Sequence, residues 1–127
     1  MRHASKFANR PIAIVWRLAS GRCRLAQIFE HVRDEFGLAE RDAFLEIFKA
    51  NVPKVLEEEG CVEYSATVDF QTEVPIQETN ANVVTVIEKW ESFPHLEAHF
   101  TAPHMLEYKA KVEGMVEDVS LKILKDA

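Results

Sequence analysis

The chain of 127 residues is long enough for one domain with its own core and too short for two domains of ordinary size. Hydrophobic residues make up 47% of it and charged residues 28%, a balance typical of a soluble globular protein. No apolar run approaches the roughly 20 residues that a membrane helix needs, so we expect no membrane span. The net charge of −6 argues against a nucleic-acid partner, because such partners require a basic surface.

The first part of the chain differs in charge from the rest. Residues 1–24 contain arginine and lysine but no acidic residue, whereas all 21 acidic residues follow. We therefore expect a basic N-terminal extension over residues 1–24 and a single domain over residues 25–127. A flexible tail, a packed extra turn, an upstream start codon and a targeting segment are all consistent with this pattern. Arg17 cuts the apolar patch of the extension too short for a secretory signal.

Two cysteines, Cys23 and Cys61, could pair with each other. Two thiols do not make a disulfide framework in a chain of this size. Reduced thiols are the simpler interpretation, and they indicate a cytoplasmic protein.

The first half of the expected domain contains a strand, a helix and a second strand. Residues 27–33 have the imperfect alternation of a short strand. The apolar residues that follow recur at steps of three and four, which predicts a helix that ends at Gly60. Pro53 lies inside this helix, so we expect a kink or a broken turn near residues 49–51. Residues 61–68 return to the period-two pattern of a strand.

The second half begins with a polar loop over residues 69–82, which is longer than a hairpin requires. The β-branched run 83–90 is the strongest strand signal in the chain. Ser92 can cap the helix that follows, because its hydroxyl can accept a hydrogen bond from an unpaired backbone N–H. Pro103 separates this helix from another, and residues 116–124 alternate as a last strand.

The order of these elements, β-α-β-β-α-β, is the plan of an α+β ferredoxin-like domain. In such a domain the helices cover one face of a four-stranded antiparallel sheet. Val84, Val86, Tyr64 and Ala66 indicate that one face of the sheet or the other is apolar. A second copy packed sheet against sheet would cover the open face, so we expect a homodimer.

Three of the five histidines lie within residues 88–104, close to Trp90. Histidine titrates near neutrality, so these side chains could transfer protons, bind a metal or pack against the indole. His95 and His99 are four residues apart on one helix face, a spacing that can ligate zinc. A catalytic zinc site needs a third ligand in a defined place, and Pro103 interrupts the helix before His104. We therefore expect no metal.

An ordered set of short motifs resembles the antibiotic biosynthesis monooxygenase family, in its small quinol-monooxygenase-like branch. The motifs are Glu59-Gly60-Cys61, Val62-Glu63-Tyr64, the strand end Glu88-Lys89-Trp90 and the block Leu96 to His104. The resemblance extends from about Phe29 to Leu124 and is weakest in the first strand. Asp34 to Gly37 stand where the family usually has a basic residue and a Pro-Gly turn.

This resemblance implies a dimeric α+β barrel with a small pocket between the sheet and the helices of each subunit. Many members oxygenate phenolic or quinol-type substrates without metal or flavin, whereas others degrade haem or isomerise small metabolites. A shared fold therefore leaves the activity open.

A cofactor-free oxygenase must deprotonate a phenol, hold its ring and stabilise the reduced oxygen, which requires a base, an aromatic wall and hydrogen-bond donors. The resemblance places His99 and His104 on the segment that covers the pocket, as candidate catalytic bases. Trp90 is the candidate wall, and Tyr64 and Tyr108 are candidates for orienting a substrate oxygen. Each of these residues also has a structural interpretation, as a core ring, a helix contact or a cross-strand pair.

The leading hypothesis is a cofactor-independent monooxygenase that oxidises a small aromatic quinol or polyphenol with molecular oxygen. The alternative is a non-oxygenase dimer that binds a small metabolite or acts in a stress response, with structural histidines. Oxygen consumption in the presence of hydroquinones separates the two hypotheses.

Overall fold

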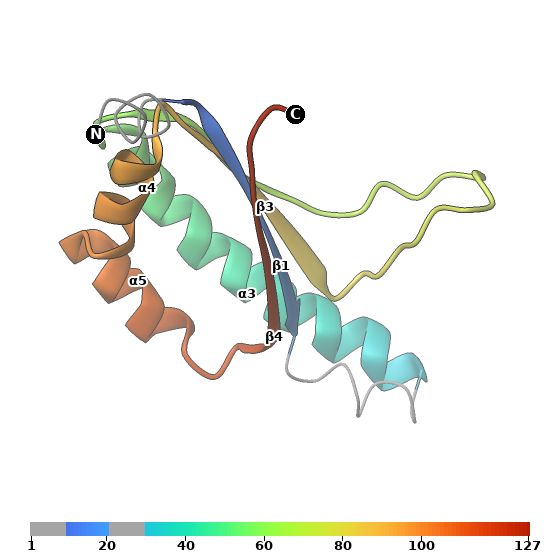
Figure 1. Cartoon of the computed structure of the whole chain (residues 1–127). Helices are drawn as coiled ribbons and strands as arrows, with labels where there is room; N and C mark the ends of the chain where they lie inside the picture. The colour runs from blue at the N-terminus through green and yellow to red at the C-terminus, as the bar shows by residue number, and fades with distance from the viewer. Residues whose placement is uncertain (1–9, 21–29) are drawn as a thin grey trace.

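The computed structural model of the chain describes residues 10–20 and 30–127, with side chains described over 10–19 and 40–127. Its elements follow one another in the order β1 (Ile12–Ser20), α3 (Glu30–Leu56), β2 (Cys61–Thr67), β3 (Val83–Trp90), α4 (Phe93–Phe100), α5 (Pro103–Val112) and β4 (Val116–Leu124). The strands lie in the order β2-β3-β1-β4, and each neighbouring pair is antiparallel. The helices lie on one side of this sheet (Figure 1). The predicted α+β ferredoxin-like fold is confirmed.

The first strand is not where the sequence pattern placed it. The strand β1 pairs with both β3 and β4, so residues 12–20, which we expected in the basic extension, form the centre of the sheet. Ile12, Ile14, Trp16 and Leu18 alternate along it and pack on the core side. Residues 30–33, expected at the end of a strand, are helical, and 27–29 lie outside the described residues. The β-branched and aromatic run of β1 outweighs its flanking arginines, because strand formation depends on the buried face.

The helix α3 is longer than predicted and is not interrupted near residues 49–51. Pro53 lies within its last turn, where the missing N–H removes a hydrogen bond close to the helix end only. Phe44, Phe48 and Val55 bury the apolar stripe that the sequence predicted. Although α3 has 27 residues, neither it nor another described helix has the length and hydropathy needed to cross a membrane.

Ser92 occupies the predicted N-cap position of α4, but its hydroxyl does not cap the backbone. Pro94, in the first turn of this helix, has no N–H to donate. The Ser92 hydroxyl instead lies 2.7 Å from Nδ1 of His95 and hydrogen-bonds to it. The prediction that the Ser92 side chain caps the helix is therefore wrong, whereas the predicted start of the helix is confirmed.

A left-handed turn at Gly60 connects α3 to β2. The φ angle of Gly60 is +84°, and its carbonyl accepts a 2.8 Å hydrogen bond from the backbone N–H of Glu91, which precedes α4. A Cβ atom at this position would overlap the ring of His95. The close approach of α4 to this turn therefore requires glycine.

Substitution of Gly60 by alanine is expected to destabilise the fold more than the same change at Gly114. Gly114 has φ +85°, but a Cβ atom there would meet nothing within 4 Å. Gly114→Ala should therefore lower the free energy of unfolding by about 1–2 kcal/mol, the cost of a left-handed backbone conformation in alanine. Gly60→Ala should lower it further, because the His95 ring must also move. Urea unfolding of the two variants measures the difference, and equal losses of unfolding free energy would contradict the close approach.

Candidate functional site

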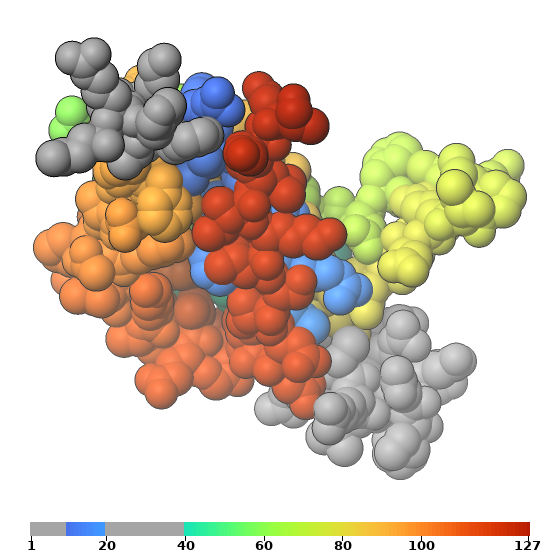
Figure 2. Space-filling view, in the orientation of Figure 1, coloured from blue at the N-terminus to red at the C-terminus, as the bar shows by residue number. Residues whose placement is uncertain are grey.

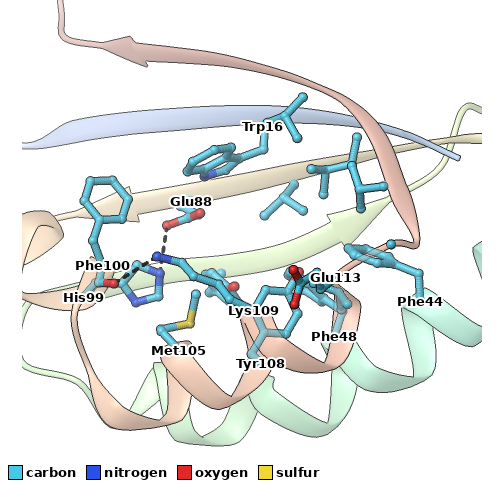
Figure 3. Close-up of a pocket in the computed structure, with 17 residues that line it drawn as sticks. Trp16, Phe44, Phe48, Glu88, His99, Phe100, Met105, Tyr108, Lys109 and Glu113 are labelled. Carbon is cyan, nitrogen blue, oxygen red and sulfur yellow. Dashed lines mark hydrogen bonds and ion pairs between the residues drawn. The ribbon is translucent and has the colours of Figure 1, made fainter. Parts of the chain in front are cut away.

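A cavity of about 360 Å³ lies between the sheet and the helices. Its lining is mainly apolar and aromatic, with side chains from β1, β2, β3 and β4 on one side and from α3, α4 and α5 on the other. This volume falls within the range of small-molecule sites. The close-up in Figure 3 shows Trp16 and Glu88 on the sheet side, facing Met105 and Tyr108 on the helix side.

Aromatic rings shape most of the wall. Phe48 and Tyr64 stack with their centroids 4.9 Å apart and their planes 8° from parallel. The ring of Tyr108 meets Phe48 edge-on at 6.0 Å, and Trp16 meets Phe100 edge-on at 6.3 Å. Such flat and angled faces suit a planar ring, because aromatic pairs favour stacked and edge-to-face contacts.

One end of the cavity is polar, as Figure 3 shows at Glu88, His99 and Lys109. The buried Glu88 accepts a 2.9 Å hydrogen bond at Oε1 from the indole N–H of Trp90, and the same oxygen lies 3.8 Å from Nε2 of His99. Burial raises the pKa of Glu88 to about 7, against the opposing hydrogen bonds from Trp90 and Trp16. At neutral pH this carboxyl group therefore exists in both protonation states.

His99 is fixed from its other ring nitrogen. Its Nδ1 lies 2.8 Å from Oε2 of Glu58, and Nε2 of His104 lies 2.8 Å from the same oxygen. Burial lowers the pKa of His99, and the hydrogen bond and charge of Glu58 oppose that shift. The imidazole is thus held neutral and oriented, as a base near neutrality requires.

The sequence-predicted site residues divide into two groups. Tyr64, Tyr108 and His99 line the cavity. Burial raises the pKa of both tyrosines, so their hydroxyls stay protonated and can donate hydrogen bonds. Trp90 is fully buried behind the wall, where its ring packs 4.7 Å from that of His99, and His104 reaches the site only through Glu58.

The sequence patterns did not identify four residues of the site: Trp16, Glu58, Glu88 and Lys109. Trp16 was assigned to the extension, although the β-branched run before it is a usable strand signal. Glu58 stands in the acidic run Glu57-Glu58-Glu59 after α3, and its side chain is 14% exposed, against 94% for Glu59. No local pattern distinguishes those two neighbours. Glu88 and Lys109 likewise look like ordinary surface charges until the fold places them on the cavity.

Glu58, His99 and His104 could also hold a metal ion, since their donor atoms lie within 4.8 Å of one another. This is a different set from the His95 and His99 pair considered in the sequence. His95 lies apart from it, because its Nδ1 hydrogen-bonds to Ser92. Two imidazoles and one carboxylate are chemically suitable for zinc or iron.

The raised pKa of Glu88 predicts a pH-dependent effect of Glu88→Gln on stability. The pKa of this carboxyl group is about 7 in the folded protein, against an ordinary value of 4.5. Its protonated form therefore contributes stability in full below the lower value, and that contribution is lost as the pH rises through about 7. The stability of the wild type relative to Glu88→Gln should therefore fall by about 3 kcal/mol across this interval. Urea unfolding of both proteins near pH 4.5 and near pH 8 measures this change. If the difference in unfolding free energy between wild type and Glu88→Gln were the same at both pH values, the raised pKa of Glu88 would be contradicted.

Comparisons with known proteins agree with this architecture. The family model described as antibiotic biosynthesis monooxygenase matches residues 39–111. The chain is 39% identical over 98 residues to the "Probable quinol monooxygenase YgiN" of Escherichia coli, covering 77% of this chain and 94% of that protein.

Solved structures show the same fold. PA3566 from Pseudomonas aeruginosa superposes with a TM-score of 0.68 at 17% identity, covering 94% of this chain and 97% of that one. SnoaB, a cofactor-independent oxygenase from Streptomyces nogalater, superposes with a TM-score of 0.63 at 11% identity, covering 91% and 92%. The family match and the curated relative together show that this chain belongs to the antibiotic biosynthesis monooxygenase family.

Proposed function

We propose that this protein is a monooxygenase that oxidises a small quinol or polyphenol with molecular oxygen, without a metal or flavin. The observation that carries the proposal is the position of His99, whose Nε2 faces Glu88 across the polar end of an aromatic-lined cavity. A substrate hydroxyl at that end would meet a base, while the substrate ring would lie against the aromatic wall.

The reaction balances without an added reductant. A quinol with a free ring position and one molecule of oxygen give a hydroxyquinone and water. Transfer of the hydroxyl proton to His99 Nε2 makes the ring electron-rich enough to pass one electron to oxygen. The resulting superoxide and semiquinone combine at a ring carbon, and loss of water from the hydroperoxide gives the quinone.

Other residues around the cavity can orient the substrate and stabilise the charge that forms on oxygen. Tyr64 and Tyr108 can donate to the substrate oxygens, since both hydroxyls stay protonated. Lys109 is the one cationic side chain among the described lining residues, and its Nζ is 3.1 Å from the carbonyl oxygen of Phe100. Its positive charge can stabilise the reduced oxygen that forms at the polar end. Trp90 supports this end from behind, through its hydrogen bond to Glu88.

The comparisons support the substrate class. The Escherichia coli relative is named "Probable quinol monooxygenase YgiN" and is matched over 94% of its length. SnoaB, whose fold is shared, is described as a cofactor-independent oxygenase. The aromatic wall and the buried histidine base fit a substrate of this kind.

His99→Ala is expected to reduce hydroquinone-dependent oxygen uptake by about 100-fold or more, because it removes the general base. His95→Ala is the matched control, since His95 lies on the same helix, is partly exposed and does not line the cavity. An oxygen electrode and a panel of one-ring and two-ring hydroquinones, in buffer with a metal chelator, provide the measurement. The proposal fails if the wild type consumes no oxygen with any member, or if both variants lose activity equally.

We also propose that the protein is a homodimer. The open face of the sheet carries Val15 and Ile87 side by side at its centre. The loop over residues 68–82 stands clear of the body, as Figure 2 shows, and exposes Phe70 by 81% and Ile76 by 90%. Its shape is held by hydrogen bonds of Gln77 to the carbonyl of Phe70 and to Thr72. Exposed apolar residues on a shaped loop are typical of an interface.

Sedimentation at micromolar concentrations should therefore show a dimer. Ile76→Asp should raise the dissociation constant by about tenfold or more if the loop contacts the partner, because it buries a charge at the interface. Glu73→Gln, an exposed change on the same loop, is the matched control. A monomeric wild type across the micromolar range would refute the homodimer.

A further inference from the structure

The carboxylate of Glu58 holds two histidines that belong to different helices. Its Oε2 accepts from Nδ1 of His99 on α4 and from Nε2 of His104 on α5, each at 2.8 Å. The exposed fraction of the side chains rises from 1% at His99 to 14% at Glu58 and 20% at His104. The cluster therefore extends from the cavity wall toward solvent, with Glu58 at its centre.

The hydrogen bonds fix where the protons lie. An ionised carboxylate only accepts hydrogen bonds, so each imidazole nitrogen that faces Oε2 must carry a hydrogen. The proton of neutral His99 is therefore on Nδ1, and the lone pair is on Nε2. That atom faces the polar end of the cavity, 3.8 Å from Oε1 of Glu88. The partner of one ring nitrogen thus determines the chemistry of the other.

We propose that Glu58 and His104 are positioning residues for the base: Glu58 holds His99 with its Nε2 lone pair toward the cavity, and His104 holds the Glu58 carboxylate. This inference rests on the proposed function, in which His99 accepts the substrate proton. Glu58 also stabilises the imidazolium that forms, because the charge-assisted hydrogen bond at Nδ1 strengthens when the ring becomes positive. His104 acts one step away, without contact with the cavity.

Several elements surround His99. Glu58 faces the ring from the turn after α3, Glu88 from β3, and His104 and Lys109 from α5, while Tyr64 on β2 packs against it. Glu58 is the group that hydrogen-bonds to Nδ1, and His104 is the group that hydrogen-bonds to Glu58. Loss of Glu58 should therefore free the orientation of the His99 ring, and loss of His104 should free the Glu58 carboxylate.

Steady-state kinetics of oxygen uptake test the inference. Glu58→Gln, which keeps an acceptor oxygen but removes the charge, should lower kcat by roughly 10- to 100-fold with little change in KM. His104→Ala should lower kcat by a smaller factor, again with little change in KM. His104→Gln, which keeps an N–H donor, should retain more of kcat than His104→Ala.

A purely structural role would give a different result. The variants would then lose stability and active fraction, kcat per folded molecule would stay unchanged in both Glu58→Gln and His104→Ala, and His104→Gln would show no advantage over His104→Ala. That outcome would overturn the inference.

Nitrogen chemical shifts of the His99 ring give a readout that does not depend on activity. The wild type should show the proton on Nδ1, and Glu58→Ala should increase the population with the proton on Nε2. A wild type with its proton on Nε2 overturns the inference whatever the activity. An Nδ1 proton together with no oxygen uptake would instead refute the proposed function and leave the positioning by Glu58 intact.

Discussion

The desolvation of Glu88 constrains the rest of this structure. A carboxyl group in the interior is costly unless hydrogen-bond donors or protonation compensate for the lost water. Two indoles supply those donors, Trp90 from the same strand and Trp16 from the neighbouring strand β1. His99 completes the surroundings from the helix side. The pairing of β1 beside β3 and the approach of α4 to the sheet therefore bring together the groups that make a buried carboxyl group tolerable.

The turn after α3 connects this interior to the surface. Gly60 lets the chain reverse within a few residues, and its carbonyl accepts a hydrogen bond from the residue that precedes α4. The end of α3 is thereby tied to the start of α4. This connection brings Glu58 to His99, which lies 41 residues later in the sequence. The orientation of the histidine depends on a backbone contact that does not involve the cavity.

Local signals predicted most of the fold and only part of the site. The strands β2, β3 and β4 and the break at Pro103 carry strong period-two or proline signals, which do not depend on tertiary contacts. The position of β1 was missed because the arginines around it were given more weight than its apolar alternation. Glu58 could not be identified at all, because its difference from Glu59 arises only when α4 and α5 pack over the turn. His99 was identified by its residue type, but its partners required the fold.

The division of the cavity into an aromatic part and a polar end has an electrostatic consequence. A phenolate is stable in a buried site only if the site does not already hold an uncompensated negative charge. Glu88, with a pKa of about 7, can take up a proton near neutrality, and an anion beside it favours the protonated form further. Lys109 adds a positive charge to the same wall. Under the proposed function, a phenolate formed at this end would therefore lie beside the imidazolium of His99, the Glu88 carboxyl group and Lys109, so that negative charge would not accumulate in the cavity.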